Sequence, residues 1–284
     1  MESSRYLTKS RFKLAVECPT KLYYHGKKVV YRSLKEEDSF LQALAEGGFQ
    51  VGKMATMLYP EGVEVTERSN AEALRRTQEL LGSSQDIVLF EPAFAFEGLL
   101  VRVDILVRRG DQIELIEVKA KSYDSLDPQI AGKRTPILSG MRPYIEDVAF
   151  QKYVVSQALP NTQIRTFLMM PDKSVNALLD GLNQCFKIKR SERNTEVLLS
   201  PDAHERVAQE AELLAKVSVD EFVDIVMSEP LDFPGSTSSP DDFLISVVKR
   251  WSESYAADRK IAPTLNKSCS KCEFRETDDG HLRS

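Results

Sequence analysis

Residues 98–121 contain two alternating apolar segments separated by a tight turn, and this pattern constrains the fold more than any other stretch. Residues 101–107 carry an aliphatic side chain at every second position, the period of a strand with one buried face. The alternation resumes at residues 113–121, after the pair Gly110-Asp111. A two-residue loop of this kind joins antiparallel strands and fixes their register. The sequence therefore predicts a β-hairpin.

The register of this hairpin brings acidic side chains together. It places Asp104 directly opposite Glu117, and Lys119 shares the face of Glu117 because the two are two residues apart. Opposite residues have Cβ atoms roughly 4.5–5.5 Å apart, so both carboxylates would reach one hard cation. The alternative is a solvated hairpin whose polar face is merely charged. Aliphatic neighbours on the same face favour the metal site; they are Leu106, Ile113 and Leu115.

Asp104 with Glu117-Val118-Lys119 resembles the D…(D/E)XK motif of the PD-(D/E)XK nuclease superfamily, although Val103 stands where that name has a proline. Other segments resemble its RecB-like branch, and within it the chain is most similar to CRISPR-associated iron–sulfur exonucleases and uncharacterised bacterial relatives. These segments are Ser10-Arg11-Phe12-Lys13, Cys18-Pro19-Thr20-Lys21-Leu22-Tyr23-Tyr24, Gln151 and Cys269-Ser270-Lys271-Cys272. The resemblance covers residues 7–275.

The resemblance implies an α/β fold with a restriction-endonuclease-like core, in which a mixed sheet is flanked by helices, and with helical additions at both ends. We expect a single nuclease-like domain over residues 1–284. Residues 1–85 would be a helical N-terminal part and residues 86–172 the nuclease core. Residues 173–284 would be a mainly helical C-terminal part that carries the CxxC pair.

The same resemblance implies a metal-dependent deoxyribonuclease that acts as an exonuclease on single-stranded DNA. Asp104, Glu117 and the backbone carbonyl of Val118 would bind Mg²⁺ or Mn²⁺, and Lys119 would orient the attacking water or neutralise charge on the phosphate. Gln151 corresponds to a family glutamine that reaches toward the metal or the scissile phosphate. The alternative for Gln151 is a buried amide that bridges core backbone.

Two positions depart from the family pattern. Gly52 stands where RecB-like nucleases have a metal-binding histidine, so Glu46 or a water molecule would complete the metal site, unless Glu46 lies on a solvated helix face. Val155 stands at the tyrosine position of the glutamine motif, and Tyr153 is a displaced substitute. These departures keep open a catalytically inactive nucleic-acid-binding module of a larger protein. A zinc- or cluster-bearing structural domain that assembles with a partner is a third alternative.

The four cysteines indicate metal binding or burial rather than disulfides. The resemblance implies that Cys18, Cys269 and Cys272 are three ligands of a [4Fe–4S] cluster. A fourth cysteine is missing after Cys272, so we expect a fragment of a longer protein that holds the cluster incompletely. His281 as a zinc ligand is an alternative. Cys185 is expected to be a small core residue.

The net charge of −5 argues against non-specific binding of nucleic acid over the whole surface. Local basic clusters would line a channel for a DNA backbone, unless they are ordinary solvated faces. They comprise Lys27, Lys28 and Arg32, then Lys119, Lys121, Lys133, Arg134 and Arg142, then Lys187, Lys189 and Arg190. The sequence has no apolar run of membrane-spanning length, and residues 1–11 lack the apolar segment of a signal peptide. We therefore expect a cytoplasmic protein without a membrane partner.

Apolar spacing elsewhere predicts the remaining elements. Helices are expected over residues 3–18, 34–58, 144–159, 172–182, 203–217, 219–227 and 241–257, the second bent or interrupted at Gly47-Gly48. Strands are expected over residues 86–96, 164–170, 185–189 and 195–199, the first broken at Pro92. Residues 122–143 and 232–240 are expected to be loops.

Overall fold

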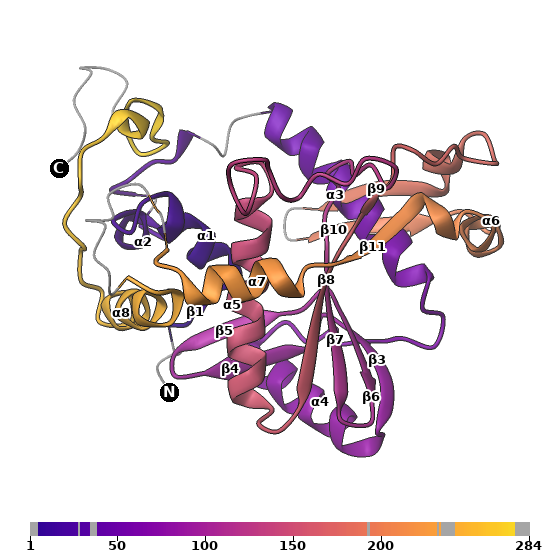
Figure 1. Ribbon diagram of the computed structural model, residues 1–284, viewed down its shortest axis with the longest axis horizontal. Helices are drawn as coiled ribbons and strands as arrows, with labels where there is room; N and C mark the ends of the chain where they lie inside the picture. The colour runs from indigo at the N-terminus through magenta and orange to yellow at the C-terminus, as the bar shows by residue number, and fades with distance from the viewer. Residues whose placement is uncertain are drawn as a thin grey trace.

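The computed structural model describes residues 5–27, 29–34, 39–191, 194–231, 233 and 242–275, and of residues 39–46, 191 and 194 it describes the backbone only. The chain is an α/β protein in which mixed sheets are flanked by helices, as the sequence predicts (Figure 1). The largest sheet described has six strands in the order β11-β8-β7-β6-β3-β2.

The six strands of this sheet pair in both directions. They are β2 (Val63–Glu64), β3 (Asp86–Phe90), β6 (Ile105–Arg109), β7 (Gln112–Val118), β8 (Gln163–Pro171) and β11 (Leu214–Ser218). The pairs β7–β8 and β2–β3 are parallel, and the other pairs are antiparallel. Helix α5 (Arg142–Ala158) lies between β7 and β8 in the chain and supplies the crossover that a parallel pair requires.

Two smaller sheets and the remaining helices complete the described fold. β5 (Leu99–Arg102) lies between β1 (Leu7–Thr8) and β4 (Ala93–Phe96), and β9 (Phe186–Ser191) pairs with β10 (Asn194–Leu199). The other α-helices are α1 (Lys9–Glu17), α2 (Lys21–Tyr24), α3 (Ser39–Met57), α4 (Asn70–Ser83), α6 (Ala203–Gln209), α7 (Asp220–Ser228) and α8 (Leu244–Ala256). Short 3₁₀ turns span Leu182–Cys185, Ala211–Leu213 and Lys267–Lys271.

The predicted hairpin register is confirmed. Arg109 pairs with Gln112 across the Gly110-Asp111 turn, and the ladder continues to the pair Ile105 and Ile116. Extended by one residue, this register sets Asp104 against Glu117. Gly110 has a φ of 58°, the left-handed conformation that such a turn requires.

The predicted single strand over residues 101–107 is wrong, because the chain bends between β5 and β6. The strands β3–β4 and β5–β6 form one long ribbon whose register continues unbroken across the bend. At the bend the Glu91 amide donates to the Asp104 carbonyl at 3.3 Å, and the Val103 amide donates to the Pro92 carbonyl at 3.1 Å. Pro92 has no amide hydrogen and Glu91 has a φ of 54°, so regular pairing stops here and the outer half enters another sheet.

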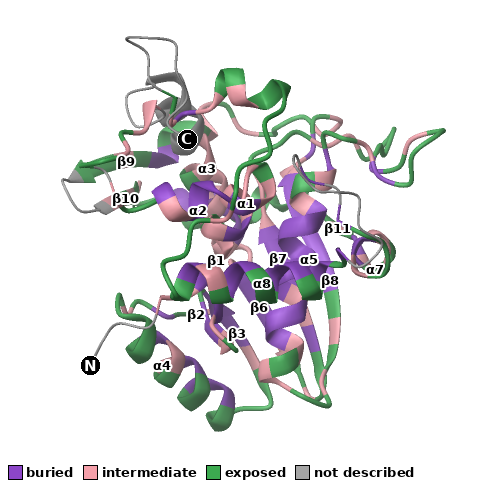
Figure 2. Ribbon diagram, turned by 90° about the vertical axis from the view of Figure 1, so that its left-hand side faces the viewer, coloured by how far each residue is buried: buried purple, intermediate pink, exposed green. Residues whose placement is uncertain are grey.

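Apolar side chains cover both faces of the six-stranded sheet. On one face Leu106 and Leu115 belong to a core shared with α1, α4, α5, α7 and α8; on the other, Ile105 and Ile116 pack with Met54 of α3 and with β9 and α6. Figure 2 shows buried residues concentrated on α5 and the strands around it. Ile105 and Leu106 point to opposite faces and both are fully buried, so this part of the sheet is shielded from solvent on both faces.

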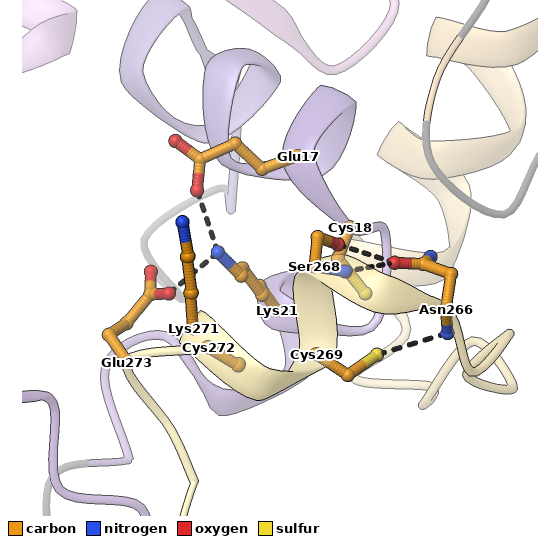
Figure 3. Close-up of a pocket in the computed structure, with 9 residues that line it drawn as sticks. All are labelled: Glu17, Cys18, Lys21, Asn266, Ser268, Cys269, Lys271, Cys272 and Glu273. Carbon is orange, nitrogen blue, oxygen red and sulfur yellow. Dashed lines mark hydrogen bonds and ion pairs between the residues drawn. The ribbon is translucent and has the colours of Figure 1, made fainter.

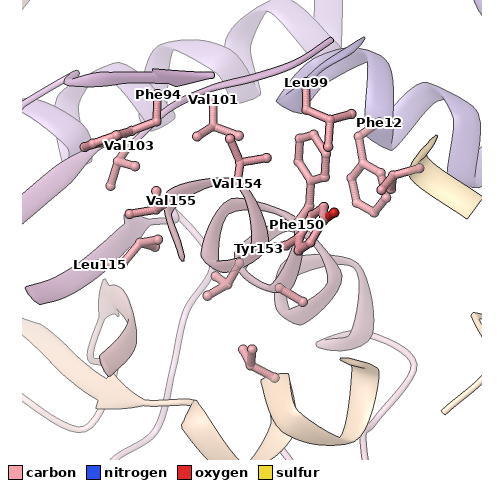
Figure 4. Packing of buried hydrophobic residues seen from close by; sticks show 14 of the residues in the cluster. Phe12, Phe94, Leu99, Val101, Val103, Leu115, Phe150, Tyr153, Val154 and Val155 are labelled. Atoms are coloured by element: carbon pink, nitrogen blue, oxygen red, sulfur yellow. The ribbon is translucent and has the colours of Figure 1, made fainter. Parts of the chain in front are cut away.

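Aromatic packing holds α1 against α5. Phe12 stacks on Phe150 (Figure 4), with ring centroids 4.6 Å apart and planes 8° apart. Trp251 of α8 lies 6.2 Å from the Phe12 ring. All three side chains are at most 1% exposed. Full burial of such a side chain contributes roughly 1.5–3 kcal/mol. This packing fixes the position of α1 relative to the hairpin.

Three further predictions of secondary structure are wrong. Residues 172–182 form turns rather than a helix. The helix predicted over residues 203–217 ends at Gln209, and Leu214–Ser218 instead forms β11, which supplies hydrogen-bond partners to the otherwise open edge of β8. Residues 7–8, inside the helix predicted over residues 3–18, form β1. Of the bend or interruption predicted at Gly47-Gly48, α3 shows no interruption. The loop predicted at residues 232–240 lies outside the described residues, apart from Phe233.

Two hairpin glycines give a matched test of the ribbon's packing. Gly98 and Gly110 have φ values of 79° and 58°, where alanine costs roughly 1–2 kcal/mol. A Cβ on Gly98 would lie 2.7 Å from Ser252 Oγ of α8, whereas a Cβ on Gly110 meets no atom within 4 Å. We expect Gly98→Ala to lower the free energy of unfolding in urea by more than Gly110→Ala does. Equal losses would contradict the packing of α8 on this turn.

Candidate active site

Asp104 lies at the corner of the bent ribbon, just before β6 begins. Its Oδ2 accepts a hydrogen bond from the Val118 amide at 2.8 Å. Val118 is the last residue of β7 and has no partner in β6 at this point, because the ladder between the two strands ends at Ile105. The Asp104 side chain thus replaces a missing strand partner, which leaves Oδ1 directed to a second group.

That second group is the ammonium of Lys9, the first residue of α1. Lys9 Nζ lies 3.0 Å from Asp104 Oδ1 and 3.2 and 3.0 Å from the two carboxylate oxygens of Glu117. Both predicted carboxylates therefore face one cation. The Glu117 side chain is 1% exposed, so its charge needs such a partner.

Lys119 lies beside the carboxylate pair, as the sequence predicts. Its ammonium contacts Glu117 Oε1 and lies 3.0 Å from Asp147 Oδ2 of α5. Asp147 is fully buried and is also bound by Lys13, whose Nζ is 2.6 Å from the same oxygen. The described site thus contains three carboxylates, Asp104, Glu117 and Asp147, and three ammonium groups, those of Lys9, Lys13 and Lys119.

Gln151 contacts the site directly. Its side chain is fully buried on α5, and Nε2 donates to Glu117 Oε2 at 2.8 Å. The alternative prediction, in which the Gln151 amide bridges core backbone, does not account for this hydrogen bond to a site carboxylate. Among the described residues, Oε1 of Gln151 and Oδ1 of Asp147 are buried without a hydrogen-bond partner. Such atoms are normally satisfied by a bound water or ion, so they identify where a bound group would be accommodated.

The pKa shifts follow from burial and charge. Burial opposes ionisation of Glu117, but Lys9 and Lys119 outweigh it and hold the pKa of Glu117 below its ordinary value. Burial and the Glu117 carboxylate raise the pKa of Asp104, and they raise that of Asp147 to about 6. Burial by itself would lower the pKa of Lys9. The Glu117 and Asp104 carboxylates outweigh burial and hold the pKa of Lys9 well above its ordinary value. The strongest anion at the site is therefore Glu117.

Glu91 places a further carboxylate near Asp104. The continuous register of the ribbon sets it opposite Asp104, and its strained φ of 54° occurs beside the site, where such conformations often have a functional role. Partial burial and the Asp104 carboxylate raise the pKa of Glu91 to about 7.

Sequence reasoning missed Glu91, Lys9, Lys13 and Asp147. One signal was present for Asp147, which precedes Gln151 by four residues and so shares its helix face. The spacing of Lys9 and Lys13 gives the same signal on α1, but it does not reveal which carboxylates they meet.

The remaining predicted site residues lie in different settings. Val118 contributes its amide to Asp104, and its carbonyl as a metal ligand stays a prediction. The Glu46 side chain lies outside the described residues. Gly52 belongs to α3, which packs on the opposite face of the sheet through Met54. Tyr153 is buried against Phe96 in the core, so it does not replace the missing tyrosine at the site.

A pocket of about 400 Å³ lies beyond the end of β7. It is formed mainly by the predicted loop between β7 and α5, and its lining includes Lys121, Tyr123, Ser139 and Lys173. Lys121 lies two residues beyond Lys119, and both ammonium groups lie near the Tyr144 ring, at 6.0 and 5.8 Å from its centroid. The pocket therefore begins two residues beyond Lys119 along the chain.

Two members of the predicted basic clusters are paired with carboxylates, and the channel itself stays a prediction. Lys27 pairs with Asp258 at 2.9 Å, and Arg142 pairs with Glu146 at 2.9 Å. Lys28 and His281 lie outside the described residues.

The three predicted cluster cysteines meet in one pocket. Cys18 follows α1, and Cys269 and Cys272 come from the C-terminal 3₁₀ turn, yet all three line a cavity of about 260 Å³ (Figure 3). Lys21 joins the two segments, since its ammonium lies 2.6 Å from both Glu17 and the nearly buried Glu273. Cys185 is instead buried in the core beneath β9, as predicted.

The thiols line this pocket without converging on one point. In the ranges given above, no three His, Cys, Asp or Glu side chains are placed to hold one metal ion. Burial raises the pKa of the Cys272 thiol. Three thiols are a donor set that suits a thiophilic metal, and the predicted [4Fe–4S] cluster, which needs a fourth ligand, stays a prediction.

Comparisons with known proteins add no family to this geometry: no protein-family model matches the chain, and no curated protein matches it. Among the described helices, none is long and apolar enough to cross a bilayer.

The cysteine pocket predicts metal binding that depends on three thiols. Anaerobic reconstitution with iron and sulfide should give visible charge-transfer absorption, because thiolates are the ligands of such clusters. Cys18→Ser, Cys269→Ser and Cys272→Ser should each reduce that absorption. Cys185→Ser is the matched control and should leave it unchanged. Colourless protein that binds zinc through the same three cysteines would replace the cluster with a zinc site.

Proposed function

We propose that this protein is a Mg²⁺- or Mn²⁺-dependent deoxyribonuclease that hydrolyses phosphodiester bonds. The observation that carries the proposal is the convergence of Asp104 and Glu117 on a single cation, which the Lys9 ammonium provides. Lys119 and Gln151 contact the same carboxylate, Glu117. Carboxylates arranged in this way are ligands that Mg²⁺ and Mn²⁺ prefer.

The residues divide the work as follows. Asp104 and Glu117 would hold the ion, and Gln151 orients Glu117 by donating to Oε2. A bound divalent ion would supply Lewis-acid chemistry at the phosphate and lower the pKa of water. The Lys119 ammonium would orient the attacking water and offset charge that develops on the phosphate oxygens. Asp147 holds Lys119 in place from the side of α5.

For the substrate, we propose single-stranded DNA and exonuclease action, on the strength of the resemblance to RecB-like nucleases. Support from the fold is the pocket that begins two residues beyond Lys119, where Lys121 would meet phosphate oxygens. Lys173 of the same pocket is paired with Asp124 at 3.3 Å. We also propose the iron–sulfur cluster at Cys18, Cys269 and Cys272, incomplete in this chain, and a cytoplasmic location. The restriction-endonuclease-like core remains part of the same proposal.

A second candidate is a catalytically inactive nucleic-acid-binding module. The contact between Lys9 and both carboxylates favours it, because an ammonium group already neutralises the charge that a metal would neutralise. The absence of a histidine at Gly52 and the burial of Tyr153 point the same way. Such a module would bind DNA with or without Mn²⁺ and would not cut it.

Three substitutions test the assigned roles. Asp104→Asn and Glu117→Gln each remove one charge from the ion site, so both Mn²⁺ affinity and DNA cleavage should fall, with activity lost on the order of 10²–10³-fold and partly recovered by excess Mn²⁺. Lys119→Ala should abolish cleavage while Mn²⁺ affinity is kept or slightly increased, because a neighbouring positive charge is removed. Calorimetric Mn²⁺ titration and cleavage of labelled single- and double-stranded DNA measure the two effects.

Glu114→Gln is the matched control, since Glu114 lies on the same strand and pairs with Lys216 at 2.9 Å away from the site. It should cleave DNA as the unmodified protein does. Unmodified protein that binds DNA but neither binds Mn²⁺ nor cuts would establish the inactive module.

A further inference from the structure

We propose that Lys9 is a built-in competitor for the divalent ion, whose ammonium neutralises Asp104 and Glu117 until a metal displaces it. This inference rests on the proposed nuclease function and concerns how its metal site is filled. Lys9 is the one described cation that contacts both carboxylates, at 3.0 Å from each. Lys119 contacts Glu117 and Asp147, and Lys13 contacts Asp147.

The charges at the site make this a competition. Glu91, the further carboxylate near Asp104, has its own partner in Arg102 at 3.8 Å. With Lys9 in place, Asp104, Glu117 and Asp147 are balanced by three ammonium groups, so a divalent ion added to this arrangement would leave two positive charges in excess. The oxygens it requires are also the oxygens to which Lys9 donates. Like charges held this close in a poorly solvated site repel strongly. Entry of the metal therefore requires departure of the Lys9 ammonium.

The structure allows Lys9 to leave without moving its helix. Its side chain is 23% exposed, so a path to solvent exists, and its four-carbon stem is flexible. Helix α1 itself is fixed by Phe12, which stacks on Phe150 at 4.6 Å. A displaced ammonium would remain beside the site, where the phosphate of a bound strand would be its next partner.

Lys9→Met tests the competition, because methionine keeps the length of the stem and removes the charge. In calorimetric titration with Mn²⁺ alone, Lys9→Met should bind at least about tenfold more tightly than the unmodified protein, a change worth about 1.4 kcal/mol. Lys13→Met is the matched control: it removes the same charge one helical turn away, where the described contact with the site is Asp147. It should change Mn²⁺ affinity much less.

The outcomes separate this inference from the proposed function. If the unmodified protein binds Mn²⁺ and cuts DNA while Lys9→Met binds no more tightly than Lys13→Met, the competition is refuted and the nuclease stands. Mn²⁺ binding by Lys9→Met alone would show that the metal cannot displace Lys9, which overturns the competition and favours the inactive module. Absence of Mn²⁺ binding in all three proteins refutes both proposals.

A second measurement needs no variant and guards against misfolding of Lys9→Met. Acetylation of the unmodified protein, followed residue by residue by mass spectrometry, should show faster labelling of Lys9 at saturating Mn²⁺ than in EDTA, because the displaced amine is no longer bound to two carboxylates. Lys216, which pairs with Glu114 away from the site, provides the reference rate. Lys9 labelling that stays constant or slows on Mn²⁺ addition would overturn the proposal.

Discussion

The burial of the Glu117 charge is the constraint on which the arrangement around it depends. A carboxylate removed from water costs several kcal/mol unless it is paired and hydrogen-bonded. Glu117, at 1% exposure, meets this cost with Lys9 of α1, Lys119 after β7 and Gln151 of α5. One side chain thus ties together a helix from the start of the chain, the central strand and the crossover helix.

The bend in the long ribbon explains why the second carboxylate reaches the same point. A straight hairpin would leave Asp104 in the ladder, with its backbone paired and its side chain beside that of Glu117. Pro92 and Glu91 interrupt the ladder on the neighbouring strand, and Asp104 then bonds through its side chain to the Val118 amide. The same interruption sends β4 and β5 into a second sheet, which packs beneath α5.

Helix α1 links the two candidate sites. Lys9 and Lys13 project from it to the carboxylates, and Cys18 follows directly after its last residue. The Lys21–Glu273 pair then joins this segment to the turn that carries Cys269 and Cys272. A metal or cluster held by the three thiols would therefore anchor the C-terminal end of the helix whose first residue occupies the carboxylate site. Structural metals are known to couple to the order of the segments that bind them in this way.

The sequence by itself determined the hairpin register, the pairing of Asp104 with Glu117, the inward face of α5 that carries Gln151, and the loop that follows β7. Each of these features depends on the spacing of apolar residues or on the residues of a turn, and both can be identified directly in the sequence. The meeting of Cys18 with the CxxC pair was inferred from a resemblance rather than from any spacing.

Only the tertiary structure placed Lys9 between carboxylates that lie 95 and 108 residues away in the chain, and only it revealed Asp147 as a partner of Lys119. It likewise showed that residues 214–217, the end of a predicted helix, belong to the edge strand β11. These features come from neutralising buried charge and from satisfying an open strand edge. The pairing of buried charges and of a strand edge depends on which distant segments come into contact. A local sequence pattern does not contain this information.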